Sequence, residues 1–265
     1  MSLDDLDFAS DLPASARIAL ACLDLTSLND ADTEADVARL CERAQSPHGP
    51  VAAVCVWPRF AALARRSLPP QIAVAAVANF PDGSADVARA VRETAEIAQA
   101  GAQEVDVVLP FERLRQGDEV AVAQLLAAVR RASDGLVLKV ILETGVLADD
   151  ALIAQAARLS LASGADFLKT STGKTPVSAT PQAARVMLRG IAADAGAAAR
   201  VGFKASGGIR SVADAATYLA LCRDALGPQS LQPRRFRIGA SSLLNDIEAV
   251  LGGRAAAAPA APGSY

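Results

Sequence analysis

Eight short apolar segments alternate with alanine-rich segments along almost the whole chain, and this alternation restricts the possible folds more than any other feature. Most of the apolar segments lack the polar–apolar alternation of a strand that has one face in water. Continuous apolar runs of this kind are typical of parallel strands that are covered on both faces. We therefore expect strands at residues 18–26, 51–58, 72–80, 104–110, 136–144, 166–172, 201–208 and 236–242.

The segments between these strands have the period of amphipathic helices. In residues 84–101, one helical face carries Val87, Ala90, Val91, Ala95 and Ala98, and Gly101 closes the segment. Residues 122–135 and 149–164 have the same form, and each also ends in glycine. Eight strands with intervening helices predict a single-domain α/β protein, a (β/α)8 or TIM barrel. An open doubly wound sheet is the alternative, although the first strand is not followed by a GxGxxG turn.

The two ends of the chain depart from this pattern. The segment before residue 18 is expected to be a short helix that covers the bottom of the barrel. We expect the barrel domain to span residues 1–252 and residues 253–265, which are rich in alanine and proline, to form a flexible low-complexity tail. The start of the chain is acidic and no apolar run reaches about 18 residues, so we expect no secretory signal and no membrane span.

Charge and histidine content narrow the chemistry. A formal net charge of −3 gives no electrostatic footprint for nucleic acid or an anionic membrane. His48 is the only histidine and lies in a predicted loop, so neither a Ser-His-Asp triad nor a multi-histidine metal site is expected. Acid–base chemistry must then come from lysine, carboxylate, tyrosine or water. The four cysteines are widely spaced, which predicts reduced thiols and a cytoplasmic location.

Ionisable residues interrupt five of the predicted strands: Asp24, Asp106, Lys139, Lys169 and Lys204. The carboxyl ends of parallel barrel strands share one face, where barrel enzymes have their active sites, so we expect these side chains to converge. An unpaired buried charge is strongly destabilising, whereas pairing between lysine and aspartate offsets that cost. A salt-bridge network without chemistry is the alternative to an active site.

Lys169 ends its strand in the stretch DFLKTSTGKT. A lysine amine attacks a carbonyl only when it is neutral, so its pKa must fall from about 10.4 toward about 7–8. Lys204, at the same depth on the neighbouring strand, would lower the pKa of Lys169, while Asp106 and Lys139 would complete a proton-relay cluster. This constellation fits Schiff-base chemistry. A surface charge and a phosphate clamp are the alternative roles of Lys169.

A phosphate site is predicted beside this cluster. The glycines of SGG (206–208) expose backbone N–H groups after the seventh strand, and GASSLL (239–244) places serines where a helix begins. The loops after strands seven and eight are the usual phosphate site of such barrels, although a tight turn and a helix cap explain each motif alone. The residues predicted to bind the substrate and its phosphate are Thr170, Gly173, Lys174, Gly207, Gly208, Gly239, Ser241 and Ser242. The thiol of Cys55 either points into the site or is a small core side chain.

The sequence closely resembles the 2-deoxy-D-ribose-5-phosphate aldolases, a family of class I aldolases. The shared motifs occur in a fixed order and extend from about residue 17 to residue 252. They are LDLTSLND (23–30), VCVWPRF (54–60), VANFPDG (77–83), EVDVVLP (104–110), LKVILETG (138–145), FLKTSTGK (167–174), GFKASGGIR (202–210) and RIGASSLL (237–244).

The resemblance implies an enzyme that reversibly cleaves 2-deoxy-D-ribose 5-phosphate to acetaldehyde and glyceraldehyde 3-phosphate, in deoxyribose catabolism and without a metal or organic cofactor. It implies that Lys169 is the Schiff-base lysine, that Lys204 lowers its pKa, and that Asp106 transfers protons. Lys139 and Asp24 are implied to support that network.

The resemblance also implies partners that are small phosphorylated sugars and aldehydes, neither nucleic acid nor a membrane, and a homodimer. Several members of the family end in tyrosine, so Tyr265 either reaches the site or belongs to a tail without a role. A transaldolase-like or other phospho-sugar aldolase, a pyridoxal-phosphate enzyme and a catalytically silent sugar-phosphate sensor are the competing interpretations.

Overall fold

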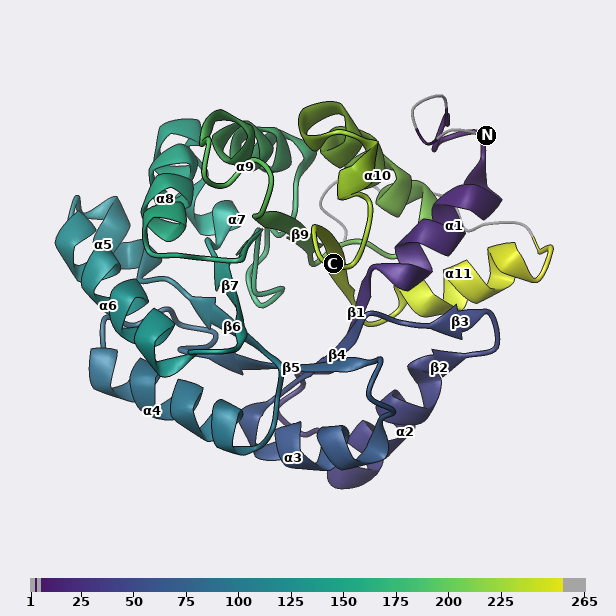
Figure 1. Cartoon of the computed structure of the whole chain (residues 1–265), viewed down its shortest axis with the longest axis horizontal. Helices are drawn as coiled ribbons and strands as arrows, with labels where there is room; N and C mark the ends of the chain where they lie inside the picture. Colours follow the sequence, from purple (N-terminus) through teal and green to yellow (C-terminus); the bar gives the residue numbers. More distant parts are fainter. Residues whose placement is uncertain (1–2, 4–5, 255–265) are drawn as a thin grey trace.

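Eight parallel strands close into a barrel in the computed structural model of the chain, which describes residue 3 and residues 6–254 (Figure 1). Their order around the barrel is β1-β10-β9-β8-β7-β6-β5-β4, and a two-stranded hairpin, β2–β3, lies outside it. The predicted (β/α)8 fold is therefore confirmed. The barrel strands are β1 (Leu23–Thr26), β4 (Ala53–Val56), β5 (Ala73–Ala78), β6 (Glu104–Val108), β7 (Val137–Ile141), β8 (Phe167–Lys169), β9 (Gly202–Ser206) and β10 (Phe236–Ala240), and the hairpin strands are β2 (Gln45–Ser46) and β3 (Gly49–Pro50).

Helices surround the barrel, as Figure 1 shows. Most of them begin after an Asp, Ser or Thr whose side chain accepts a backbone N–H of the first turn, which satisfies a donor that the helix itself leaves free. These capping residues are Asp11, Thr33, Asp86, Asp118, Asp149, Thr180 and Ser211. The helices are α1 (Leu12–Ala21), α2 (Glu34–Arg43), α3 (Pro58–Ser67), α4 (Val87–Gln99), α5 (Phe111–Arg115), α6 (Glu119–Ala132), α7 (Thr144–Leu147), α8 (Asp150–Ala162), α9 (Pro181–Ala193), α10 (Val212–Leu226), α11 (Leu243–Leu251) and the 3₁₀ turn η1 (Pro228–Ser230).

The first strand is shorter than the sequence indicated. Residues 18–21 were expected to begin a strand, but they form the last turn of α1, and β1 starts at Leu23. The helix packs against α10 and α11 in the outer ring and buries Ala16, Ala19 and Leu20 there. A short apolar run fits a buried helix face as well as a strand, which is why the pattern misplaced this boundary.

The strand register brings the charged residues of the chain to the barrel interior. Lys169 of β8 pairs with Lys204 of β9, which in turn pairs with Arg237 of β10. Asp106 of β6 pairs with Lys139 of β7. Residues that are paired in register point to the same face of a sheet, and alternate residues point to opposite faces. The apolar alternates therefore pack against the helices, while the charged ones meet inside.

Other expectations concern the ends of the chain and its environment. From residue 255 onward the predicted tail, including Tyr265, lies outside the described residues, and α11 ends at Leu251. Within residues 6–254, no helix has the length and apolar character needed to cross a bilayer.

Candidate active site

Seven charged side chains meet inside the barrel, and we call them the ion cluster. All are buried, with exposed fractions between 0% and 6%. Burial of so many charges is tolerable only if each has an oppositely charged neighbour. The ion cluster consists of Asp24, Glu104, Asp106, Lys139, Lys169, Lys204 and Arg237.

Asp106 lies at the centre of the ion cluster and accepts hydrogen bonds from three amines. Its Oδ1 atom is 2.7 Å from Nζ of Lys139, and its Oδ2 atom is 2.8 Å from Nζ of both Lys169 and Lys204. Lys169 is the last residue of β8, lies in register with Lys204, and is the only one of the three lysines with any exposed surface, at 2%. One carboxylate thus holds the predicted nucleophile and the predicted companion cation together.

A second layer of ion pairs supports this centre. Arg237 donates from Nη1 to Asp24 at 2.6 Å and from Nη2 to Glu104 at 2.7 Å. Glu104 also lies 2.5 Å from Nζ of Lys139, and Asp24 lies 2.5 Å from Nζ of Lys204. Lys139 and Lys204 therefore each pair with a second carboxylate besides Asp106.

The electrostatic surroundings distinguish Lys169 from the other basic members. Burial would lower the pKa of Lys139 and Lys204, but their carboxylate neighbours outweigh burial and raise it. Burial likewise lowers the pKa of Lys169, Asp106 opposes that shift, and Lys204 adds to it, so that the pKa falls below its ordinary value. Of the four basic groups in the ion cluster, Lys169 alone has a lowered pKa.

The carboxyl groups of the ion cluster are held ionised. Burial would raise the pKa of Asp106, but Lys139, Lys169 and Lys204 outweigh it and hold the pKa well below the usual range. Asp24 and Glu104 follow the same pattern, because their cationic neighbours more than offset burial and lower the pKa of each.

A cavity of about 300 Å³ opens above the ion cluster, at the carboxyl ends of β1, β8, β9 and β10, and we call it the mouth cavity. It has a polar lining of glycine backbone and hydroxyl groups. Seven residues predicted to bind substrate or phosphate line it: Gly173, Lys174, Gly207, Gly208, Gly239, Ser241 and Ser242. The two serines precede α11, so the N-terminus of that helix faces the cavity.

Glycine is required at two of these positions for different reasons. Gly207 has a φ of +85°, and a Cβ atom there would lie 2.6 Å from Ser178. A Cβ at Gly239 would lie 2.6 Å from Oγ of Ser206 and 3.0 Å from Cε of Lys204. The first glycine shapes the cavity wall, whereas the second leaves room for the side chain of Lys204.

Thr170 and Cys55 lie away from the lining of the mouth cavity. The buried hydroxyl of Thr170 accepts from the backbone N–H of Ser206 at 3.0 Å and donates to its carbonyl at 3.2 Å, so it joins β8 to β9. Cys55 is fully buried on β4. Burial raises the pKa of its thiol, and the charge of Asp106 adds to this effect, which places the thiol close to the ion cluster.

Lys174 and Glu143 organise the rim. Nζ of Lys174 donates to the carbonyl of Leu28 at 2.7 Å, which connects the segments after β8 and β1. Glu143 is buried with a φ of +54°, and its carboxylate accepts from the hydroxyls of Thr172 and Thr175. Burial raises the pKa of Glu143.

Sequence reasoning missed Glu104, Arg237 and Ser178. Glu104 lies two residues before Asp106, and Arg237 two residues before Gly239, so the alternation of side chains along a strand could have placed both inside the barrel. The loop position of Ser178 offers no such signal. Among the described residues, no group of three histidine, cysteine, aspartate or glutamate side chains is arranged to hold a metal ion.

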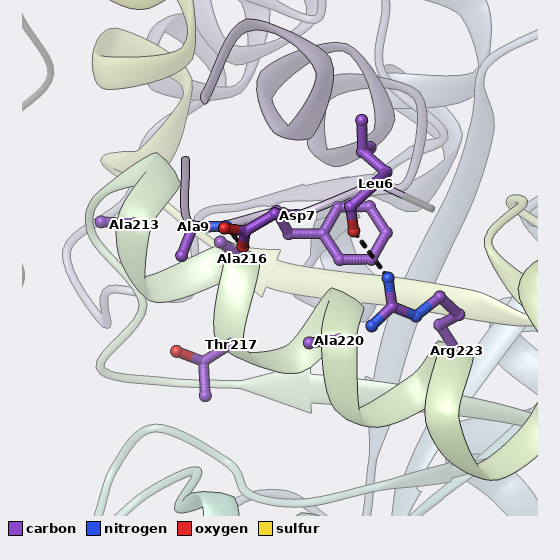
Figure 2. A pocket seen from close by; sticks show the side chains of 9 residues that line it. Leu6, Asp7, Ala9, Ala213, Ala216, Thr217, Ala220 and Arg223 are labelled. Carbon is purple, nitrogen blue, oxygen red and sulfur yellow. Dashed lines mark hydrogen bonds between the residues drawn. The ribbon is translucent and has the colours of Figure 1, made fainter. Parts of the chain in front are cut away.

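A separate cavity of about 430 Å³ lies between the N-terminal segment and α10 (Figure 2). Arg223 of α10 donates to the carbonyl of Leu6 at 2.6 Å, and its guanidinium lies 4.9 Å from the centre of the Phe8 ring. No member of the ion cluster lines this cavity. The mouth cavity, with Lys169 below it, is therefore the candidate active site.

Comparisons with known proteins show the family to which the chain belongs. The model of the family described as DeoC/LacD family aldolase matches residues 18–249. A proposed deoxyribose-phosphate aldolase from Coccidioides immitis is 30% identical, with 87% of this chain and 85% of that chain covered and a TM-score of 0.75. A second, from Toxoplasma gondii ME49, is 26% identical, with 92% and 98% covered and a TM-score of 0.84. The deoxyribose phosphate aldolase from Aeropyrum pernix, described as having a unique tetrameric structure, is 26% identical, with 92% and 97% covered and a TM-score of 0.71.

Proposed function

The chain belongs to the DeoC/LacD family of aldolases, which are carbon–carbon lyases, and we propose that it reversibly cleaves 2-deoxy-D-ribose 5-phosphate to acetaldehyde and D-glyceraldehyde 3-phosphate through a Schiff base on Lys169. The names of the similar structures support the substrate. The observation that carries the mechanism is the position of Lys169. Its amine ends a strand below the mouth cavity, and its pKa is lowered by burial, with Lys204 as a further cause.

The reaction begins with attack of the neutral Lys169 amine on the substrate aldehyde carbon. The carbinolamine that forms loses water, with protons supplied through Lys204 and Asp106, and becomes an iminium ion. Lys139 and Asp24 hold these two groups in place. The positive charge on nitrogen then makes the substrate an electron acceptor.

Cleavage of the bond between C2 and C3 follows removal of the proton from the C3 hydroxyl. Asp106 is the nearest carboxylate to the Lys169 nitrogen, and imine formation reduces the number of N–H groups that it must accept. The bonding electrons move to the iminium and leave an enamine, while C3 becomes the aldehyde of glyceraldehyde 3-phosphate. Protonation of the enamine at C2 and hydrolysis release acetaldehyde and restore Lys169.

The mouth cavity holds the phosphate of the substrate. Gly207 and Gly208 form part of its wall, and the N–H of Gly207, which donates to the carbonyl of Gly239 at 3.3 Å, would have to turn to the phosphate. Ser241 and Ser242 lie at the start of α11, and Lys174 adds a positive charge. These contacts are far from the breaking bond, so they bind substrate and transition state alike and act mainly on KM.

The decisive experiment is reductive trapping of acetaldehyde, followed by intact mass and peptide mapping. The chain has four lysines, Lys139, Lys169, Lys174 and Lys204, and three of them are buried in the ion cluster. The background from surface lysines is therefore small. We expect one ethyl group on Lys169 in the wild type and none at this position in Lys169→Arg, which keeps a cation but cannot form the imine.

An adduct confined to Lys174 or the N-terminal amine would contradict the mechanism and favour a sugar-phosphate sensor. A panel of phosphorylated sugars then tests the substrate, because a transaldolase-like enzyme would trap the same lysine but cleave other sugars.

We also propose that copies of this chain associate as a homodimer in the cytoplasm. The tetramer described for the Aeropyrum pernix protein makes a larger assembly the alternative. Light scattering of the purified full chain separates the two masses.

A further inference from the structure

We propose that Arg237 is a positioning residue that favours the neutral form of Lys169 through the charge balance of the ion cluster, and that Glu104, its bidentate partner, acts in the opposite direction. The inference rests on the proposed Schiff-base function, because it concerns the protonation state of the nucleophile. Lys169 forms its ion pair with Asp106, whereas Arg237 pairs with Asp24 and Glu104, and Glu104 also pairs with Lys139, so both must act through other members of the ion cluster.

The contacts of Arg237 fix it rigidly. Its Nε donates to the carbonyl of Pro233 at 2.5 Å, Nη1 donates to Asp24 at 2.6 Å and to Glu104 at 3.1 Å, and Nη2 donates to Glu104 at 2.7 Å. The two bonds to Glu104 form a bidentate pair, which a guanidinium makes and an ammonium does not. The opposite side of Arg237 borders a cavity of about 560 Å³ at the amino ends of the strands.

The charges of the ion cluster balance in one protonation state. Leaving Lys169 aside, three cations (Lys139, Lys204 and Arg237) face three carboxylates (Asp24, Glu104 and Asp106), which gives a net charge of zero. A protonated Lys169 brings the total to +1. Charge that is not balanced is costly in a buried site, so the neutral amine is favoured. Arg237 contributes a permanent positive charge to this sum because its guanidinium does not deprotonate in proteins.

Other ionisable groups also surround Lys169 and the pair. Cys55 on β4 and Glu143 at the start of α7 lie near Lys169. Arg17 of α1 and His48 of the β2–β3 turn line, together with Arg237, the cavity at the amino ends of the strands. None of these groups differs among the variants considered below. Differences between the variants therefore report on Glu104 and Arg237 themselves.

Removing Glu104 and removing Arg237 change the net charge of the ion cluster in opposite directions. Glu104→Gln leaves the ion cluster at +1 with Lys169 neutral, so protonation becomes harder and the pKa of Lys169 falls further. Arg237→Met leaves it at −1 with Lys169 neutral, so protonation becomes easier and the pKa of Lys169 rises. The double variant returns the count to zero. Arg237→Lys keeps the charge and loses the bidentate geometry.

The test measures how fast acetaldehyde with cyanoborohydride labels Lys169 as pH is raised, in the full-length protein and each variant. Labelling needs the neutral amine, so its rate rises through the pKa of Lys169. We expect the midpoint to fall by about one pH unit in Glu104→Gln and to rise by about one unit in Arg237→Met. At a pH below all the midpoints, the first variant should then label roughly a hundredfold faster than the second. The double variant and Arg237→Lys should keep the wild-type midpoint.

Arg235→Met is the matched control. Arg235 is also largely buried beside β10, but its guanidinium donates to the carbonyls of Ala198, Ala199 and Val201, outside the ion cluster. Its loss changes the total charge of the protein as Arg237→Met does, and it should leave the midpoint unchanged. If Arg237→Met fails to fold, as judged by circular dichroism, the isosteric Glu104→Gln still tests the sign.

The possible results separate this inference from the proposed function. Wild-type labelling at Lys169 with the same midpoint in Glu104→Gln and Arg237→Met, or shifts of one sign, would overturn the charge-balance role and leave the Schiff base standing. Absence of labelling at Lys169 in the wild type would overturn both.

Discussion

The ion cluster and the mouth cavity lie next to each other in the barrel, yet they are built in opposite ways. In the ion cluster, every charged group is buried and has an oppositely charged neighbour within 2.8 Å. The mouth cavity is lined by glycine backbone and by exposed Ser241 and Ser242, and the hydroxyl of Ser178 has no hydrogen-bond partner within residues 6–254.

This difference follows from what each region must do. A buried lysine stays neutral only where the carboxylates do not outnumber the other cations, so its surroundings must be complete before substrate arrives. A phosphate site needs donors that remain free until the ligand accepts from them. Changes in the ion cluster should therefore reduce stability and chemistry together, whereas changes in the mouth cavity should act mainly on substrate binding.

The largest effect is expected for Asp106→Asn. The change removes the charge that three amines share, and breaking a buried ion pair from one side typically costs about 3–5 kcal/mol. We expect a loss of this size in the free energy of unfolding, measured by urea denaturation, together with loss of turnover. Ser241→Ala is the matched control from the mouth cavity and should keep the stability within about 0.5 kcal/mol. A stable but inactive Asp106→Asn protein would show that the ion cluster tolerates an uncompensated charge.

The part of this comparison that could be predicted from sequence is the convergence of the charged residues. Asp106, Lys139, Lys169 and Lys204 each interrupt an apolar strand, and parallel strands in a barrel bring such residues together. The structure shows that they meet. Their position in the interior, rather than at the exposed strand ends, depends on the register, which the sequence pattern does not define.

Roles that depend on packing could not be predicted from the sequence. Arg237 was not predicted, although alternation along β10 gives it the same face as Gly239, and the register places it beside Lys204. Thr170 and Gly239 were expected to bind substrate, and their assignment stays a prediction. Thr170 hydrogen-bonds to Ser206, and a Cβ atom at Gly239 would meet the side chains of Ser206 and Lys204. Both relations depend on the distance between neighbouring strands.

An intermediate effect is expected at the paired glycines of the mouth cavity. Gly207 and Gly208 have positive φ values of +85° and +78°, so alanine at either position costs about 1–2 kcal/mol of backbone strain. A Cβ at Gly207 would also lie 2.6 Å from Ser178, whereas Gly208 has no described atom within 4 Å of that point. Gly207→Ala should therefore raise KM for the phosphorylated substrate more than Gly208→Ala does. Equal KM values in steady-state assays would mean that the cavity wall yields to the added methyl group.

The smallest effect is expected for Ser178→Ala. Ser178 is 4% exposed and lines the mouth cavity, and its hydroxyl finds no acceptor or donor in the described part of the chain. Loss of an unpaired buried hydroxyl removes a group that is unfavourable without ligand, so stability should stay constant or rise slightly. If the hydroxyl donates to the substrate phosphate, KM should rise by roughly threefold to tenfold while kcat is retained, because a single hydrogen bond contributes about 0.5–1.5 kcal/mol. The same change should leave KM for an unphosphorylated deoxyribose substrate unaltered. A fall in kcat with both substrates would instead place Ser178 with the reacting groups. Ser178 would then act in the chemistry, as the ion cluster does, although it lines the mouth cavity.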